Sequence, residues 1–468
     1  MPKAVQNIYE PVDASPVKSF FVTMLTRDIK LEEAILDLLD NCVDGILRTE
    51  KHPKKNKPYE GFYAEITFNR DSFCITDNCG GIPWDLHKYA FHMGRPNDRL
   101  PDASGTVGVY GIGMKRAIFK MGKQCRISTQ NKDNMYEIEI TPEWIDNEQV
   151  WKIPVKEAKK AMPKDGTTIL VGQLYEGIST RFHDEIQSFT AELKKMVSTH
   201  YAFIIEKGFK VSINGGVVAP QPTKFIFSKK DRGIQPFMFK STVDGVEVFM
   251  AVGFTRPLPS EDEVAADQEE TRYSTVDAGW TVLCNDRAVL YCDRSELTGW
   301  GEAGVPRYHT QFIAISGVVE FKCNDASKLP TTTTKRGIDA SSPLYLQIKN
   351  KMREGMRLFI DYTNKWKGKE DQAKKHLEEE KAISFGEVKI QSSNIKFRAT
   401  KRSMPAGTQH KPDLPLPKKI EARLRRISYT KDVSQVRLVS AYLFKDNDVD
   451  PAVVGEKCFD LIAREAKK

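Results

Sequence analysis

The sequence predicts a mixed α/β protein with several domains. Its 468 residues are enough for two to four domains, and 40% hydrophobic residues with 10% aromatics provide ordinary apolar cores. A helical pattern over residues 31–46 precedes a strand-like segment over 73–76, and residues 235–345 are rich in strand-like segments. Helices and strands therefore alternate in the first half, and strands dominate the middle of the chain.

Residues 31–46 have the period of an amphipathic helix. The apolar face carries Leu31, Ile35, Leu38, Cys42 and Ile46, and the opposite stripe carries Glu33, Asp37, Asn41 and Asp44. The ordinary interpretation of such a stripe is a solvated acidic face. The alternative is a helix beneath a cavity, where the amide oxygen of Asn41 binds Mg²⁺ and Asp37, one turn earlier, orients or deprotonates a water.

The segment FCITDNCGGIP begins at Phe73 and predicts a short strand followed by a tight turn. An ordinary hairpin turn is one interpretation. In the functional interpretation, Asp77 accepts a hydrogen bond from the exocyclic amine of a base. A base without that donor would leave the acceptor unpaired, so the contact discriminates. Gly81 would then let the base approach the backbone closely.

A glycine-rich segment, GTVGVYGIGMKRAIFKMG, occupies residues 105–122 and leads into a helical pattern. Glycine reaches positive φ at no steric cost, so backbone N–H groups can converge on an anion, and the helix N-terminus points to the same place. Lys115 adds a positive charge for phosphate. The spacing is neither a Walker P-loop nor a dinucleotide fingerprint. A flexible loop that caps a helix is the alternative.

In this order the segments resemble the motifs of the GHKL ATPases: gyrase B subunits, heat-shock chaperones of the ninety-kilodalton class, MutL and histidine kinases. DLLDN (37–41) resembles their ExxxN helix, DNCGG (77–81) their DxGxG turn, and GVYGIGMK (108–115) their lid. DGTTILV (165–171) is similar to their fourth motif. The resemblance implies a Bergerat fold, an α/β sandwich with a mixed sheet that binds Mg-ATP under a mobile lid.

The resemblance also implies roles for the matching residues. Asn41 would bind magnesium, Asp77 would bind adenine with Thr167 hydrogen-bonding nearby, and the phosphates would meet Gly108, Gly111, Gly113 and Lys115. The family's catalytic base is usually Glu, whereas this chain has Asp37, whose carboxylate stops about 1–1.5 Å short. Misplacement of that order costs roughly a hundredfold in rate. Slow hydrolysis is therefore expected, and a non-hydrolysing ATP-binding scaffold is the alternative.

Within this family, GVYGIGMK followed by an apolar helix is most similar to the microrchidia (MORC) ATPases and their bacterial relatives. A histidine kinase would carry a phospho-acceptor His on a helix pair before the ATP domain, and no His precedes Asp37. The strand-rich half resembles the transducer domain of such proteins, which sends one lysine to the γ-phosphate. Lys335 matches that lysine, with Arg336 beside it. A polar turn before a helix near Ser342 is the alternative.

These observations divide the chain into six segments. They are an N-terminal arm (1–30), the ATP-binding domain (31–220), a transducer-like domain (221–345), a helical arm (346–384), a basic linker (385–426) and a small C-terminal module (427–468). The arm is a coiled coil or a single solvated helix. Residues 388–426 hold eleven Lys or Arg and two acidic residues, while the whole chain is only +8. Such a stretch contacts nucleic-acid phosphates or serves as a solubilising tether.

Several classes are not expected from the sequence. It has no 18-residue apolar stretch and no signal pattern, so no membrane span is expected. Its eight cysteines include no CxxC pair, so we expect neither a disulfide framework nor a zinc site. This cysteine usage is typical of a protein in the reducing cytoplasm. The leading hypothesis is an ATP-gated homodimeric clamp around DNA, with a partner effector protein, in DNA maintenance or anti-phage defence. A chaperone-like protein is a further alternative.

Overall fold

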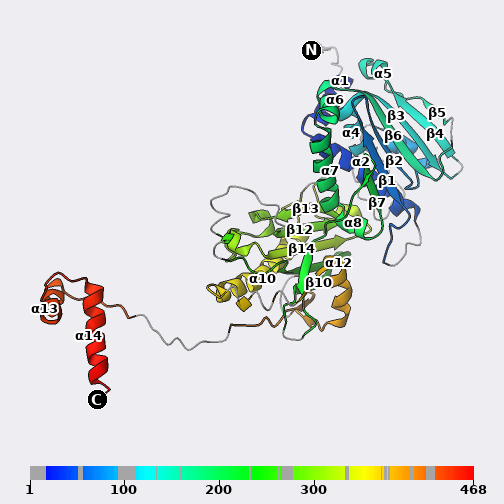
Figure 1. Cartoon of the computed structure of the whole chain (residues 1–468). Helices are drawn as coiled ribbons and strands as arrows, with labels where there is room; N and C mark the ends of the chain where they lie inside the picture. The colour runs from blue at the N-terminus through cyan, green and yellow to red at the C-terminus, as the bar shows by residue number, and fades with distance from the viewer. Residues whose placement is uncertain are drawn as a thin grey trace, which may run out of the picture. The chain divides into compact units, whose positions relative to one another are not determined.

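The chain folds into two compact units, Met1–Pro417 and Lys418–Lys468. The first unit contains two lobes, each built on its own sheet (Figure 1). The computed structural model describes residues 17–50, 56–92, 112–132, 134–158, 161–230, 233–260, 263–264, 278–332, 337–369, 372–373, 377, 380–400, 405–417 and 427–467. Within these ranges, no helix is both long and apolar enough to cross a membrane. The predicted mixed α/β class is confirmed.

The first lobe is an α/β sandwich around an eight-stranded sheet with the order β5-β4-β3-β6-β2-β1-β7-β8. β1 pairs with β7 in parallel and with β2 in antiparallel orientation, so the sheet is mixed, as the resemblance implied. The strands are β1 (Tyr63–Phe68), β2 (Ser72–Asp77), β3 (Gly122–Asn131), β4 (Asn134–Ile140), β5 (Val155–Glu157), β6 (Gly166–Leu174), β7 (Lys210–Ile213) and β8 (Gly216–Val217).

Helices pack on one face of this sheet. They are α1 (Lys18–Arg27), α2 (Leu31–Thr49), α3 (His87–Phe91), α4 (Gly113–Met121), α5 (Pro142–Asp146), α6 (Glu176–His183), α7 (Ile186–His200) and α8 (Ala202–Glu206). β2 alternates between half-buried and buried residues, and its buried Phe73 and Ile75 share a core with α2 and α4. Asp77 follows the same alternation, so it lies on the helix-covered face.

The apolar face of α2 is buried as its period predicted, but the opposite stripe is not solvated. Asp37 and Asp44 are buried, and Glu33 and Asn41 are half-buried. The interpretation of this stripe as an ordinary solvated acidic face is therefore wrong. α4 packs against α2 at this stripe, and Arg116 of α4 contacts Asp37.

The second lobe has a seven-stranded sheet with the order β13-β12-β14-β11-β10-β17-β16. Its strands are β10 (Phe237–Val243), β11 (Val246–Phe254), β12 (Gly279–Cys284), β13 (Arg287–Asp293), β14 (Ile315–Lys322), β16 (Arg398–Ala399) and β17 (Thr408–His410). α10 (Pro343–Trp366) packs on one face, and α8 with α12 (Phe385–Gln391) packs on the other. β11 and β12 are buried on both faces, which explains their nearly continuous apolar sequences.

The segment expected to be a helical arm (346–384) differs in the structure. α10 begins after the N-cap Ser342 and ends at Trp366, and it buries Ile348, Met352 and Phe359 against the second sheet. A strand, β15 (Lys381–Ser384), then pairs with β9 (Lys224–Phe227). Arg357 and Asp361 of α10 are exposed, whereas its apolar face is buried, so the helix belongs to the lobe core.

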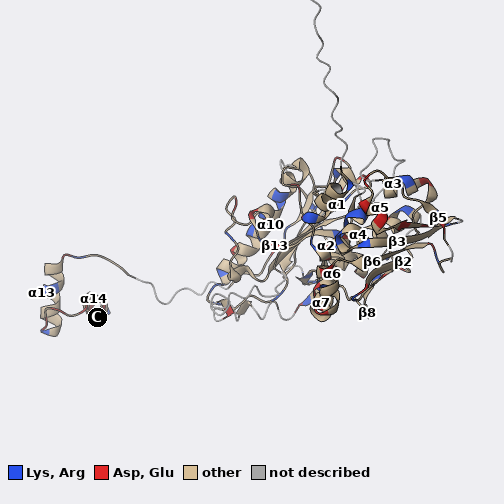
Figure 2. Ribbon diagram, turned by 90° about the horizontal axis from the view of Figure 1, so that it is seen from above, with Lys and Arg blue, Asp and Glu red and all other residues tan. Residues whose placement is uncertain are grey.

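The expected basic linker (385–426) is also partly folded. α12, β16 and β17 lie within it, and β17 pairs with β10 of the second sheet. Short edge strands carry little hydrophobic periodicity, which is why the sequence pattern did not reveal them. The second compact unit begins at Lys418. In Figure 2, acidic and basic positions are interspersed over both lobes of the first unit.

The second unit is helical in its described part. It contains α13 (Val433–Phe444) and α14 (Pro451–Glu465). The side chains of Asp432 and Asp450 cap the two helix N-termini.

Candidate nucleotide site

Four segments that are distant in sequence meet on the helix-covered face of the first sheet. They are the middle of α2, the end of β2, the first turn of α4 and the start of β6. A Cβ atom added at Gly113 would lie 3.5 Å from the Cβ of Asp37, so the start of α4 packs directly on α2. The structure thus brings together most of the predicted residues. Gly105, Gly108, Gly111 and Lys335 lie outside the described residues.

Asp77 is a buried carboxylate at the end of β2. Its Oδ1 accepts a hydrogen bond of 2.7 Å from the backbone N–H of Cys79, and Cys42 Sγ lies 3.5 Å from its Oδ2. Burial raises the pKa of Asp77 to about 6, although hydrogen bonds from the backbone of Cys79 and from Cys42 oppose the shift. A thiol is a weak donor, so Oδ2 retains capacity for a stronger one.

The turn after Asp77 is shaped by close backbone approaches. Gly81 has a φ of +65°, and a Cβ there would lie 1.9 Å from the carbonyl oxygen of Gln130. A Cβ at Gly166 would lie 2.0 Å from the carbonyl oxygen of Asp77. The need for glycine at Gly81 therefore comes from the adjacent strand β3, a reason that the sequence analysis did not foresee. Both glycines hold the Asp77 turn tightly against β3 and β6.

Thr167 lies at the start of β6, beside Asp77. Its backbone N–H hydrogen-bonds to the Asp77 carboxylate, and its Oγ1 lies 3.1 Å from Oγ1 of Thr129. Thr129 also accepts a hydrogen bond of 2.8 Å from the N–H of Ile82. These contacts join β3, β6 and the glycine turn around the carboxylate. Thr167 and Asp77 are therefore adjacent in the structure.

Asn41 supplies the polar group with an unmet hydrogen-bonding requirement. Its Nδ2 atom is buried and has no hydrogen-bond partner among the described residues. The two ends of an amide are assigned from their surroundings, so either the oxygen or the nitrogen can face this position. A buried polar atom without a partner is costly unless a ligand completes it. Asn41 thus fits the role of an oxygen ligand to a hard cation such as Mg²⁺.

Two cationic side chains, Lys115 and Arg116, lie in the first turn of α4. Arg116 Nη2 lies 2.5 Å from Oδ2 of Asp37, and the two side chains are 14% and 7% exposed. Lys115 is buried, and burial lowers its pKa to about 8. The N–H groups of the helix N-terminus add positive potential at the same place. The sequence analysis identified Lys115 but not Arg116, although Arg116 follows it directly.

The raised pKa of Asp77 predicts a pH-dependent affinity for the base. Below about pH 6 the folded chain protonates this carboxyl, which weakens it as an acceptor for an amine. We therefore expect the affinity for adenosine, which has no phosphates to titrate, to fall up to about tenfold per pH unit below pH 6. Ligand-observed NMR between pH 7.5 and pH 5 measures it. A constant affinity over that range would contradict the assignment of Asp77.

The raised pKa of Asp77 also makes the folding stability depend on pH. The folded-state pKa lies above the ordinary value of 3.8, so the folded chain binds this proton more tightly than the unfolded chain. The contribution of Asp77 is thus unfavourable above about pH 6 and disappears below about pH 4. The carboxylate is kept at a cost to folding, which is typical of a group retained for binding.

A comparison with known families agrees with this geometry. Residues 29–167 match the family model described as histidine kinase-, DNA gyrase B-, and HSP90-like ATPase. No curated protein matches the chain. The matched range includes Asp37, Asn41, Asp77 and Lys115 and ends at Thr167. The first lobe is therefore similar to GHKL-type ATPase domains, and this similarity supports ATP binding.

Proposed function

We propose that this chain is a Mg-ATP-binding GHKL ATPase that hydrolyses ATP slowly and works as an ATP-gated switch. The observation that carries the proposal is the convergence of a buried acceptor (Asp77), an amide whose Nδ2 has no hydrogen-bond partner among the described residues (Asn41) and two cations at a helix N-terminus (Lys115 and Arg116). An adenine amine, a magnesium ion and phosphates are complementary to these three features. The family match over residues 29–167 supports the same conclusion.

Each residue of the site has a proposed role in binding or hydrolysis. Asp77 would accept a hydrogen bond from the adenine amine, and Asn41 would hold Mg²⁺, which neutralises phosphate charge. Lys115 and the α4 N-terminus would bind the phosphate oxygens. Asp37 would take the proton of the water that attacks the γ-phosphate. One oxygen of this carboxylate, Oδ2, is paired with Arg116.

The ion pair between Asp37 and Arg116 also favours a second candidate function. The contact with Arg116 engages one oxygen of Asp37, and Asp is shorter than the Glu usual in this family. A non-hydrolysing ATP-binding scaffold would use the same pocket without turnover. Steady-state phosphate release, measured with and without DNA, separates the two: the ATPase releases phosphate, and the scaffold releases none above a no-protein blank.

We further propose that nucleotide controls dimerisation through Lys335. A ligand shifts such an equilibrium only by its differential affinity for the two states, and a lysine that reaches the γ-phosphate would provide that difference. A non-hydrolysable ATP analogue should therefore convert monomer to dimer in sedimentation, and Lys335→Ala should block the shift while nucleotide still binds. Lys328→Ala, an exposed lysine of the same lobe, is the matched control. Identical sedimentation with and without the analogue would rule out the clamp.

The remaining partner assignments stay predictions. Lys389 of the basic stretch is ion-paired with Glu320, so we confine the proposed nucleic-acid contact to residues 418–426, which carry five Lys or Arg. The likeness to MORC ATPases rests on the GVYGIGMK segment, on the apolar helix after it and on the strand-rich second half. A partner effector protein is proposed because the motifs already described contain no second catalytic centre.

A further inference from the structure

The turn between β12 and β13 is built to contact the first lobe. Its two residues, Asn285 and Asp286, have φ values of +48° and +69°, a combination that Asn and Asp tolerate in tight hairpins. The Asn285 side chain both accepts from the backbone N–H of Cys323 (3.1 Å) and donates to its carbonyl oxygen (3.0 Å). The turn is therefore held rigidly against the end of β14.

Arg287, the residue after this turn, forms a fully buried ion pair with the nucleotide helix. Its Nε donates to Oδ1 of Asp40 at 2.9 Å, and the side chains of Arg287 and Asp40 are 2% and 1% exposed. The guanidinium lies 4.6 Å from the ring centroid of Tyr201, whose Oη is 2.6 Å from the same Asp40 oxygen. Burial raises the pKa of Tyr201 well above its usual range, so the phenol remains a donor.

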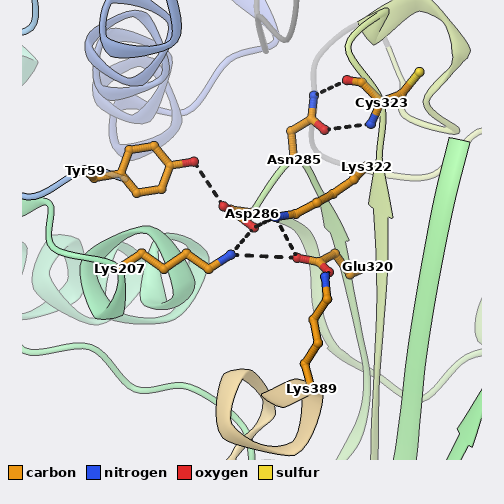
Figure 3. Close-up of polar contacts among 8 residues, drawn as sticks. All are labelled: Tyr59, Lys207, Asn285, Asp286, Glu320, Lys322, Cys323 and Lys389. Atoms are coloured by element: carbon orange, nitrogen blue, oxygen red, sulfur yellow. Dashed lines mark hydrogen bonds and ion pairs between the residues drawn. The ribbon is translucent and has the colours of Figure 1, made fainter. Parts of the chain in front are cut away.

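Asp286, on the other side of the turn, contacts a different part of the first lobe (Figure 3). Tyr59 donates to its Oδ2 at 3.1 Å, and Lys207 lies 2.6 Å from its Oδ1. Lys322 completes the site from β14 at 3.1 Å. The lysines beside Asp286 hold the pKa of its carboxyl well below its usual range. Two adjacent residues of opposite charge thus attach the second lobe to the first.

Asp40 occupies a position that matters for the proposed chemistry. It directly precedes Asn41 and follows Asp37 by one helical turn on α2. A buried ion pair is weak evidence for stability, because removing two charges from water costs about as much as their attraction returns. It does fix orientation, because the hydrogen bond from Arg287 Nε and the stacking on Tyr201 both constrain where the Asp40 carboxylate lies.

We propose that Arg287 is a positioning residue of the nucleotide site, which acts through Asp40 to set the rotation of α2 and so the placement of Asp37 and Asn41. This inference rests on the proposed function. Through the β12–β13 turn, the second lobe would then influence the rate of ATP hydrolysis in the first lobe. By linkage, nucleotide bound at α2 acts back on the same turn with an equal coupling free energy.

The test compares the wild-type chain with the double variant Asp40→Leu/Arg287→Met, which removes both charges and leaves neither one buried alone. We expect the affinity for a non-hydrolysable ATP analogue to change less than about threefold, while phosphate release falls at least about tenfold, within the usual range of such couplings. In wild type, the analogue should slow amide hydrogen exchange in residues 279–293. In the double variant this response should be lost.

Two further variants make the result specific. Glu32→Gln removes a different ion pair of α2, formed with Arg181 of α6 inside the first lobe, and should keep the wild-type exchange response. Arg287→Lys keeps the positive charge but not the planar guanidinium donor, so it should lose part of the hydrogen-exchange response. If the double variant does not fold, Arg287→Lys takes its place in the test.

The outcomes separate the inference from the function it rests on. A folded double variant that hydrolyses ATP at the wild-type rate and keeps the exchange response overturns the role of Arg287 and leaves the ATPase standing. A wild-type chain that binds no nucleotide overturns the proposed function and this inference with it.

Discussion

Asp77→Asn is expected to abolish ATP binding while the chain stays folded. The amide can keep Oδ1 as the acceptor for the backbone N–H of Cys79, 2.7 Å away, so the turn need not change. Its Nδ2 would then replace Oδ2 and face the adenine amine with a second donor. Losing a charge-assisted hydrogen bond and burying an unpaired donor together cost about 3–5 kcal/mol, or roughly two to four orders of magnitude in affinity.

Calorimetric titration with Mg-ATP measures this effect. Asp71→Asn, an exposed carboxylate in the β1–β2 turn, is the matched control and should bind like wild type. Circular dichroism of both variants reports whether the sheet is intact. Unchanged affinity in Asp77→Asn would mean that this carboxylate does not contact the base.

Asp37→Ala is expected to stop turnover and leave Mg-ATP binding largely intact. Removing a general base typically lowers the rate by about 10²–10⁴-fold. The variant also leaves the Arg116 guanidinium without its partner at 2.5 Å, so a loss of stability is expected as well. Asp37→Asn keeps an acceptor for Arg116 and should be equally inactive but more stable, which separates catalysis from packing.

Single-turnover phosphate release and thermal melting, run in parallel, check this prediction. Asn41→Ala should weaken both binding and turnover, because it removes the proposed magnesium ligand rather than the base. If Asp37→Ala hydrolyses ATP at the wild-type rate, another group activates the water. Glu33, one turn earlier on the same stripe of α2, would then be the first to examine.

The sequence predicted the helix α2 and the motif residues of the candidate site. The 3.6-residue period predicted α2 and its buried face, and the resemblance of the ordered motifs to the GHKL ATPases implied that Asp37, Asn41, Asp77 and Thr167 lie in one domain. Contacts between distant segments had no such signal. Asp40 was not singled out, because its importance depends on Arg287, which lies 247 positions away in the sequence. The requirement for Gly81 likewise comes from Gln130 on another strand.

In the second lobe, the charged composition of one segment led to a wrong prediction of its structure. α10 is rich in Lys and Arg, and that charge suggested a free arm. Its apolar residues Ile348, Met352 and Phe359 nevertheless recur at steps of four and seven, which is the period of a helix with one buried face. That signal was present in the sequence but was outweighed by the charges. β17, with three residues, is too short to produce any periodic signal.

We propose that one Mg-ATP binds where α2, β2 and α4 meet. Titration of the full chain with a non-hydrolysable ATP analogue, with and without Mg²⁺, tests it most directly. We predict saturable binding of one nucleotide per chain, in the roughly micromolar to millimolar range, weakened when Mg²⁺ is omitted and lost in Asp77→Asn. No saturable binding up to millimolar nucleotide, or binding unaffected by both Mg²⁺ and Asp77→Asn, would contradict the account.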